Sequence, residues 1–320
     1  MNSRLTRCPV CLSGEPAFAC KAILYPGCER DILLCPRCAA AYYWPVPSLE
    51  EVARCYPHAY YFDFFKQYWK DYYKGRMLAR ELAAWKKEGV LLDVGCALGT
   101  LLAGARDYSS WKVLGLEFSP WAAQTGRELN KVEIASVGDL SGAPWPAESV
   151  DFIHMNNVLE HERDGEAALA AAARLLRPKG RLRLVVPNGP VDLRSTKDLY
   201  FKWKRAVVTR HGGHLFFYSK KSLAILLKRL GFRPLSIKNF HFQTGLKARG
   251  LKPGAYKIFK RMPEAPSPDG IAPPSLEECK RAIPPQPSWP SYFLSSKWRG
   301  FWRWEGLEYG YDFDVLAEKI

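Results

Sequence analysis

The chain has 320 residues, of which 48% are apolar, so it can bury a full hydrophobic core and is expected to hold one large domain with an appendage. Its formal charge of +15, from 47 basic and 32 acidic residues, suggests contact with a polyanion, a phosphate-bearing substrate or an anionic membrane surface. The sequence has no apolar run of about eighteen residues and no apolar signal core at its N-terminus, so we expect a soluble, cytoplasmic protein.

Four of the nine cysteines form two C-x-x-C pairs near the N-terminus, Cys8 with Cys11 and Cys35 with Cys38. Each pair can place two thiolates on one side of a metal, and two pairs complete a closed tetrahedral shell for zinc. A chain without an export signal is expected to keep its thiols reduced, which favours metal over disulfides. The sequence therefore predicts a structural zinc ribbon over residues 1–45.

The next part of the chain is dense in aromatic residues and then turns helical up to Lys87. We expect residues 46–88 to form an aromatic helical cap that packs across the mouth of the following domain.

Residues 90–101, VLLDVGCALGTL, predict a strand, a tight turn with glycines at 95 and 99, and the start of a helix. Glycines at such a junction let the backbone pass close to a ligand. Glu117 ends the next predicted strand about twenty residues later, where an acidic side chain can accept hydrogen bonds from both hydroxyls of a ribose. Asp93, just before the turn, would repel a pyrophosphate, so the pattern favours a cationic ligand over a dinucleotide.

These stretches continue with VGDL at 137–140, FIHMNNVLEH at 152–161 and LLRPKGRLRLVVPN at 175–188. In order and spacing they resemble the successive motifs of class I S-adenosylmethionine (SAM)-dependent methyltransferases. The resemblance implies an α/β fold, a Rossmann-like seven-stranded sheet with helices on both faces, to which the small N-terminal zinc ribbon is added. It also implies SAM as the cofactor, with contacts from Asp93, Gly95, Cys96, Gly99, Glu117, Phe118, Asp139, Leu140 and Asn156.

Two residues of these motifs, Ala97 and Asp139, leave a question open. Many members of the family have glycine where this chain has Ala97, and we expect an alanine with negative φ to fit there. The resemblance places Asp139 beside the adenine amino group, but a turn aspartate or a helix cap would show the same residue.

Methyl transfer requires an aligned acceptor and, for a hydroxyl or an activated carbon, removal of a proton, a role that suits histidine. His161, next to Glu160, is one candidate base, and an ordering role in its loop is the alternative. His154 lies within an apolar strand and is expected to be a packed core histidine.

A second candidate region is HGGHLFFYS at 211–219. Together with the N-terminal 60 residues, it resembles bacterial methyltransferases of surface-polysaccharide and secondary-metabolite pathways, in which this stretch borders the acceptor pocket. The resemblance makes His214 and Tyr218 candidate acceptor contacts or base. The alternative is a motif that starts the next helix, with Ser219 as its cap.

The methyltransferase core is expected to span 89–242, with its last strand at 309–320. Residues 191–210 form a basic insertion with interleaved aromatics that we expect to overhang the active-site edge of the sheet. The insertion could clamp a phosphate, lie on anionic lipid or be a solvated helix face. Residues 243–308, rich in proline and then tryptophan, predict an irregular excursion or lid.

We therefore expect a SAM-dependent methyltransferase that methylates a small or glycosidic acceptor, such as a sugar or related metabolite, at oxygen. The acceptor is expected to be a small molecule or sugar that can carry phosphate, and peripheral contact with an anionic membrane stays open. The alternative is an RNA methyltransferase with a zinc-ribbon substrate module, which the basic residues favour. Nucleic acid is the less favoured partner, because the sequence has no recognisable RNA-binding module and no N/D-P-P-Y motif of amino-methylating enzymes. A non-catalytic scaffold would need a damaged cofactor site, and this one is intact.

Overall fold

The structure is a computed structural model that describes residues 7–25, 27–56, 58–209, 213–241, 273–295 and 310–320. Within these ranges no helix is both long and apolar enough to cross a membrane. The tryptophans at 298, 302 and 304 and the proline-rich stretch up to residue 272 lie outside them, so the part of the predicted excursion that they form is not described.

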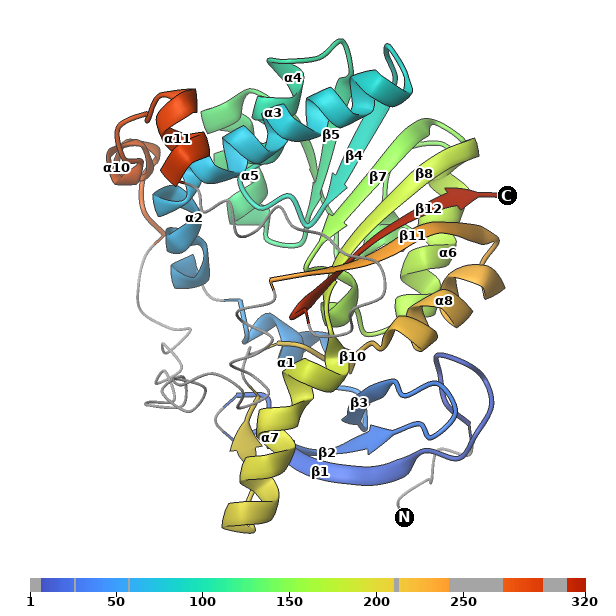
Figure 1. The fold of residues 1–320 in the computed structure, drawn as a ribbon. Helices are drawn as coiled ribbons and strands as arrows, with labels where there is room; N and C mark the ends of the chain where they lie inside the picture. Colours follow the sequence, from blue (N-terminus) through green and yellow to red (C-terminus); the bar gives the residue numbers. More distant parts are fainter. Residues whose placement is uncertain (1–6, 26, 57, 210–212, 242–272, 296–309) are drawn as a thin grey trace.

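A seven-stranded sheet forms the centre of the molecule (Figure 1), in the order β11-β12-β8-β7-β4-β5-β6. Its strands are β4 (Val90–Val94), β5 (Lys112–Glu117), β6 (Glu133–Ser136), β7 (Val150–Asn156), β8 (Leu176–Pro187), β11 (Phe232–Phe240) and β12 (Asp312–Lys319). The pairs from β6 to β8 are parallel, whereas β12 pairs antiparallel with both β8 and β11. The predicted Rossmann-like sheet of seven strands is confirmed, and its last strand, β12, is antiparallel to its neighbours.

The order of the strands decides where a ligand can bind. From β4 the chain moves outward to β5 and β6 and then returns to β7, which pairs with the other side of β4. Such a reversal opens a crevice at the carboxyl ends of the strands. Both central strands are almost wholly buried, as their apolar sequences require.

Helices cover both faces of this sheet (Figure 1). α4 (Thr100–Arg106) and α5 (Pro120–Asn130) lie on one face, and α6 (Gly165–Leu175) and α8 (Lys220–Arg229) lie on the other. Ser119 caps α5 and Ser219 caps α8, each accepting a hydrogen bond from a backbone N–H of the first turn. The cap role predicted for Ser219 is therefore confirmed.

The segment between the cysteines and the core consists of α1 (Leu49–Ala53), the 3-10 turn η1 (His58–Tyr61), α2 (Phe62–Lys66) and α3 (Tyr68–Trp85). α3 packs closely on α4 at two glycines. A Cβ on Gly75 would lie 2.0 Å from the carbonyl oxygen of Leu101, and a Cβ on Gly104 would lie 1.9 Å from the carbonyl oxygen of Tyr72. Such contact is open only to glycine.

The described part of the segment expected to be irregular, residues 273–295, contains two helices joined by an irregular stretch. The helices are α10 (Leu276–Ala282) and α11 (Trp289–Ser295), which lie beside α2, α3 and α5 (Figure 1). The Tyr73 hydroxyl and the Trp69 indole of α3 donate to the carbonyls of Pro287 and Pro284. These helices therefore brace the outer side of the cap.

A second sheet lies beside the core, in the order β10-β3-β2-β1-β9. β1 (Ala17–Ile23), β2 (Glu29–Leu34) and β3 (Ala41–Trp44) belong to the cysteine-containing N-terminal segment, whereas β9 (Val207–Val208) and β10 (Phe216–Phe217) come from the part of the chain between β8 and α8. The buried apolar residues of β1, β2, β3 and β10 belong to the same buried cluster as Leu92, Leu116 and Ile153 of the central sheet. The boundary predicted near residue 45 therefore marks no separate body.

The basic insertion is helical over α7 (Gly189–Trp203). α7 packs on β1, β9 and β10 of the second sheet (Figure 1), with Leu193, Thr196 and Leu199 buried. The insertion thus supports the N-terminal sheet, which differs from the expected position over the active-site edge. The spacing of these three residues along α7 explains the difference. They lie on one face of the helix, and a face that is buried needs a surface to pack on.

Candidate active site

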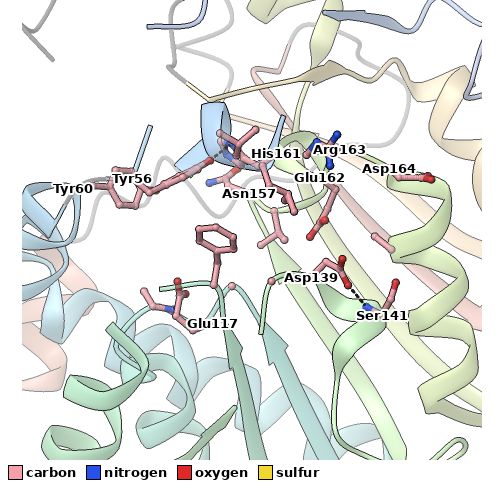
Figure 2. A pocket seen from close by; sticks show the side chains of 18 of the residues that line it. Tyr56, Tyr60, Glu117, Asp139, Ser141, Asn157, His161, Glu162, Arg163 and Asp164 are labelled. Carbon is pink, nitrogen blue, oxygen red and sulfur yellow. Dashed lines mark hydrogen bonds between the residues drawn. The ribbon is translucent and has the colours of Figure 1, made fainter. Parts of the chain in front are cut away.

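A pocket opens at the crevice between β4, β5 and β7, and the helical cap closes it from one side (Figure 2). From the sheet come Gly95 after β4, Glu117 and Phe118 at the end of β5, and Asn157 just past β7. The other walls are formed by Leu49, Val52, Tyr56, Tyr60, Tyr61 and Phe64 from the cap, by Gly138, Asp139 and Ser141 after β6, and by Val158, His161, Glu162, Arg163, Asp164, Ala167 and Ala168 before and in α6. Residues far apart in the sequence therefore share one cavity.

The turn after β4 has three residues in the left-handed region: Gly95 (φ +68°), Ala97 (φ +48°) and Gly99 (φ +66°). The negative φ expected for Ala97 is wrong. The left-handed conformation costs a residue with a Cβ roughly 1 kcal/mol, and the hydrogen bond from the Ala97 N–H to Glu117 Oε2 (2.8 Å) helps to hold it. Gly95 cannot carry a Cβ either, since one would lie 2.6 Å from Val158 Cγ2.

Glu117 is 5% exposed and is held by three donors. Its Oε1 accepts from the Tyr61 hydroxyl at 2.8 Å and from the Ser119 N–H at 2.9 Å, in addition to the Ala97 contact at Oε2. Burial raises the pKa of this carboxyl. A carboxylate offers about four lone-pair sites, so it retains capacity for a ligand hydroxyl in the pocket.

The cap contributes an aromatic wall to the pocket, and these side chains were not among the residues predicted for the site. Tyr60 contacts Tyr56, Tyr61 and Phe64 edge-on or tilted, with ring centroids 5.1, 5.2 and 5.6 Å apart. Tyr60 is 44% exposed and Phe118, at the end of β5, is 38% exposed. The high density of aromatic residues at 42–65 was the sequence feature that could have pointed to this wall. Which of these side chains face the pocket depends on how the cap packs on the core.

The pocket is acidic, although the chain is basic. Glu117, Asp139, Glu162 and Asp164 line it, against the single arginine Arg163. Burial, with the nearby Asp139 and Asp164 carboxylates, raises the pKa of Glu162 to about 7. Such a lining suits a cationic ligand and disfavours a polyanion.

Asp139 is a cap residue that also lines the pocket, and its contact with adenine stays a prediction. Its Oδ1 accepts from the backbone N–H groups of Ser141 (2.8 Å) and Gly142 (3.2 Å) and so caps the 3-10 turn η2 (Leu140–Gly142). The same side chain lines the pocket. A cap role fixes the carboxylate and leaves it able to contact a ligand.

His161 lies on the pocket wall opposite Glu117 (Figure 2). Its Nδ1 is 2.8 Å from the Gly213 carbonyl oxygen and 2.6 Å from the Tyr56 hydroxyl. A carbonyl only accepts, so Nδ1 carries the hydrogen and Nε2 has the lone pair. Gly213 adopts φ +87°, and a Cβ there would lie 2.9 Å from the Tyr56 hydroxyl oxygen.

His214 is buried behind His161, with ring centroids 4.8 Å apart. Its Nδ1 is 2.8 Å from Asp192 Oδ2, and this carboxylate raises the pKa of His214 against the opposing effect of burial. Of the two histidines proposed as the base, only His161 lines the pocket.

Several other predicted site residues do not line the pocket. The Asp93 carboxylate accepts from Nδ1 of His154 at 2.8 Å inside the sheet, and His154 is the buried core histidine that was expected. Tyr218 is buried against Gly165, where an added Cβ would lie 2.3 Å from its hydroxyl oxygen. Tyr218, predicted as an acceptor contact or base, therefore does not line this pocket. The remaining predicted residues outside the pocket lining are Cys96, Gly99, Leu140 and Asn156.

Each of these four has a packing reason. Gly99 starts α4 and packs on Val132 and Ile134, and Cys96 lies against Gly115. Leu140 is fully buried, and the pocket position expected for Asn156 belongs to its neighbour Asn157. Strand parity or a turn directs such side chains away from the crevice.

The four N-terminal cysteines come together as predicted. Cys8 Sγ lies 3.7 Å from Cys38 Sγ, Cys11 Sγ lies 3.7 Å from Cys35 Sγ, and all four sulfurs lie within 4.8 Å of one another. Tetrahedral zinc with Zn–S bonds of about 2.3 Å requires sulfurs about 3.8 Å apart. The cluster therefore fits a structural zinc ion.

This cluster is tied to the core. Ser219 Oγ donates to the Cys38 carbonyl at 2.6 Å, and the Arg229 guanidinium binds both the Val10 carbonyl, at 2.6 Å, and the Glu166 carboxylate. The N-terminal sheet is thus fastened to α6 and α8.

Comparison with known sequences gives partial matches. Nocamycin O-methyltransferase of Saccharothrix syringae is 34% identical over 112 residues, 33% of this chain and 40% of that protein. An uncharacterised 37.1 kDa protein in a transposon of Streptomyces fradiae is 37% identical over 103 residues, 30% of each chain. This chain thus matches less than half the length of these curated relatives.

A geranyl diphosphate methyltransferase solved in complex with SAM is 14% identical, with a TM-score of 0.46 over 78% of this chain and 84% of that one. The sequence model of a methyltransferase domain matches residues 67–237, which is 171 of the 320 residues and extends from α3 to β11. The chain therefore belongs to the methyltransferase domain family.

Proposed function

We propose that the protein transfers a methyl group from SAM to an oxygen of a small-molecule or sugar acceptor. The observation that carries this proposal is a single pocket that has the Glu117 carboxylate on one wall and the His161 imidazole on the opposite wall. The resemblance to nocamycin O-methyltransferase over a third of the chain supports a small acceptor and an oxygen target.

The residues of the cofactor half fit SAM. Gly95 brings the backbone to the pocket without a side chain, and Glu117 can accept from ribose hydroxyls. The exposed rings of Tyr60 and Phe118 could stack on the adenine ring of SAM. The carboxylates of Asp139 and Glu162 suit the positive charge of this cofactor. When bound, SAM would supply an electrophilic methyl group on a sulfonium.

His161 would accept the proton of the acceptor hydroxyl. Its Nδ1–H donates to the Gly213 carbonyl, which orients the ring and leaves Nε2 as the basic nitrogen. The Tyr56 hydroxyl oxygen lies 2.6 Å from Nδ1 and accepts from the same N–H, so this contact connects the cap to the imidazole ring. The cap would thereby exclude water from the acceptor.

We further propose that Cys8, Cys11, Cys35 and Cys38 hold a structural Zn²⁺. Four thiolates fill the tetrahedral shell and leave no position for water, so the ion would stabilise the fold and take no part in transfer.

The RNA alternative has weaker support. A polyanion would have to approach a pocket that carries four carboxylates and one arginine. The described cations of residues 191–209 lie on α7, which packs on the N-terminal sheet, or directly after its C-terminus, and none of them lines the pocket.

The test combines binding and turnover in the full chain. Calorimetry should show one site for S-adenosylhomocysteine per chain, and radiolabelled SAM should transfer its methyl group to members of a panel of hydroxylated metabolites and nucleotide sugars. His161→Gln should abolish transfer and leave S-adenosylhomocysteine binding unchanged. Preference for NAD over S-adenosylhomocysteine, or methylation of RNA alone, would overturn the proposal.

A further inference from the structure

Glu160, His161 and His214 place three metal-binding groups at one point beneath the pocket wall. Nε2 of His161 and Nε2 of His214 each lie 3.9 Å from Glu160 Oε1, and the three donor atoms lie within 4.8 Å of one another. Glu160 and His161 belong to the 3-10 turn η3 (Leu159–His161), whereas His214 comes from the loop before β10. The second sheet and the core therefore meet at this cluster.

The two rings are oriented as metal-binding histidines are. Such histidines bind the ion through one nitrogen and donate the other N–H to a carboxylate or a backbone carbonyl. Nδ1 of His214 lies 2.8 Å from Asp192 Oδ2, and Nδ1 of His161 lies 2.8 Å from the Gly213 carbonyl oxygen. Both contacts occupy Nδ1 and place the other ring nitrogen, Nε2, on the side that faces Glu160.

The third group lacks a hydrogen-bond partner. Glu160 is 1% exposed, and neither of its carboxylate oxygens has a hydrogen-bond partner among the described residues. The two imidazoles at 3.9 Å are too far away to hydrogen-bond to it, and a buried carboxylate without a hydrogen bond costs several kcal/mol, so its position calls for an explanation. A cation between the carboxylate and the two imidazoles would satisfy it.

We propose that Glu160, His161 and His214 bind a divalent transition-metal ion. Two imidazoles and one carboxylate suit ions such as Fe²⁺, Co²⁺ or Zn²⁺, and three protein ligands leave a coordination position open. This site is distinct from the four-cysteine cluster, which uses thiolates alone.

Metal binding at this site does not depend on the proposed function. Only its effect on methyl transfer rests on the proposed function. An ion on Nε2 of His161 occupies the lone pair that would take the acceptor proton, so the ring cannot serve as ligand and base together. A metal ion lowers the pKa of a hydroxyl that it binds. Because His161 lies on the pocket wall, the ion would replace the imidazole as the activator of the acceptor oxygen.

The experiment uses the full chain with zinc in the cysteine cluster and weakly bound metal removed by dialysis. Titration with CoCl₂, followed by calorimetry and by the visible absorption of Co²⁺ with nitrogen and oxygen ligands, should show one additional ion per chain. Glu160→Gln keeps the shape of the side chain and should weaken Co²⁺ binding more than about 100-fold, as should His214→Ala. Asp192→Asn alters the outer hydrogen bond to Nδ1 of His214 and keeps an oxygen that can accept from the Tyr311 hydroxyl, and it should weaken Co²⁺ binding by roughly 10–100-fold.

His241→Ala is the matched control, because it removes a half-exposed histidine outside the cluster and should leave Co²⁺ binding unchanged. The absence of saturable binding to the wild type, or equal binding to Glu160→Gln, would overturn the inference. S-adenosylhomocysteine binding separates the two proposals. A chain that binds S-adenosylhomocysteine but no Co²⁺ keeps His161 as the base, and one that binds Co²⁺ but no S-adenosylhomocysteine loses the methyltransferase function alone.

Discussion

The Tyr61 hydroxyl donates to Glu117 Oε1 at 2.8 Å, and this contact joins the aromatic cap to the edge of the central sheet. Tyr61 is 3% exposed and Glu117 5% exposed, so the bond is shielded from water. The residue that would hold the ribose is thus positioned by a side chain 56 residues earlier, and closure of the cap and affinity for the cofactor are expected to be coupled.

Glu117→Ala should weaken S-adenosylhomocysteine binding by about 1.5 to 3 kcal/mol, the scale for loss of a charged hydrogen-bond partner. Tyr61→Phe should weaken it less, because the two backbone donors to the carboxylate remain. Calorimetry measures both, with Glu128→Ala on the exposed face of α5 as the control. Equal affinity in Glu117→Ala and the wild type would refute the assignment of Glu117 to the ribose.

Cys35→Ser should remove the zinc of the four-cysteine cluster and unfold the N-terminal sheet, because binding energy at a structural site is folding energy. Unfolding should spread further than residues 1–45, since β9 and β10 complete the same sheet. Elemental analysis and hydrogen exchange check the two effects. Cys55→Ser, at a half-buried cysteine outside the cluster, should change neither, and an ordered N-terminal sheet in metal-free protein would contradict the structural role.

Gly104→Ala should destabilise the fold by about 3 kcal/mol, because its Cβ would overlap the Tyr72 carbonyl oxygen and push α3 away from α4. Chemical denaturation measures the change in unfolding free energy. Gly138→Ala is the control, since nothing lies within 4 Å of a Cβ at that position. Comparable stability of the two variants would show that α3 adjusts without cost.

Glu162 should make both stability and cofactor affinity depend on pH. Its pKa is raised from 4.5 to about 7 by burial, so between these values the folded protein holds a proton that the unfolded chain has released. The contribution of Glu162 to stability therefore falls as pH rises from about 4.5 to 7 and is level outside that window.

A cationic ligand attracts the ionised carboxylate, so the affinity for SAM should rise as pH increases through 7. Glu162→Gln should flatten both pH profiles, as measured by thermal unfolding and by calorimetry. If the variant retained the wild-type profile, the dependence would belong to another group.

The tip of α7 is proposed to contact an anionic membrane surface. Phe201 and Trp203 are 51% and 45% exposed, and the Lys204 ammonium and the Arg205 guanidinium lie over their rings. Charge reversal at Lys202 and Lys204 should abolish sedimentation with anionic vesicles and leave turnover of a soluble acceptor unchanged, because α7 does not line the pocket. Charge reversal at Lys220 and Lys221 on α8 is the control. A raised acceptor KM would instead support recognition of phosphate, and binding to RNA that falls log-linearly with salt would support the RNA alternative.

The sequence by itself determined the central sheet, the place of the turn after β4, the position of Glu117 at the end of the next strand, and the four-cysteine cluster. Each of these depends on local spacing: an apolar strand that ends in a glycine turn, an acid at the end of the next strand, and two C-x-x-C pairs. Such patterns constrain the backbone within a few residues, so they predict local structure and the edge of the sheet on which it lies.

Only the tertiary structure decided which side chains meet. Asp93 accepts a hydrogen bond from His154, Tyr218 is buried in the core, and α7 packs on the N-terminal sheet, and in each case the contact lies outside the motif that contains the residue. The convergence of Tyr56, Glu160, His161 and His214 depends on the docking of the cap and of the loop before β10 on one turn. Contacts between segments this far apart arise from long-range packing, which the spacing within a motif does not specify.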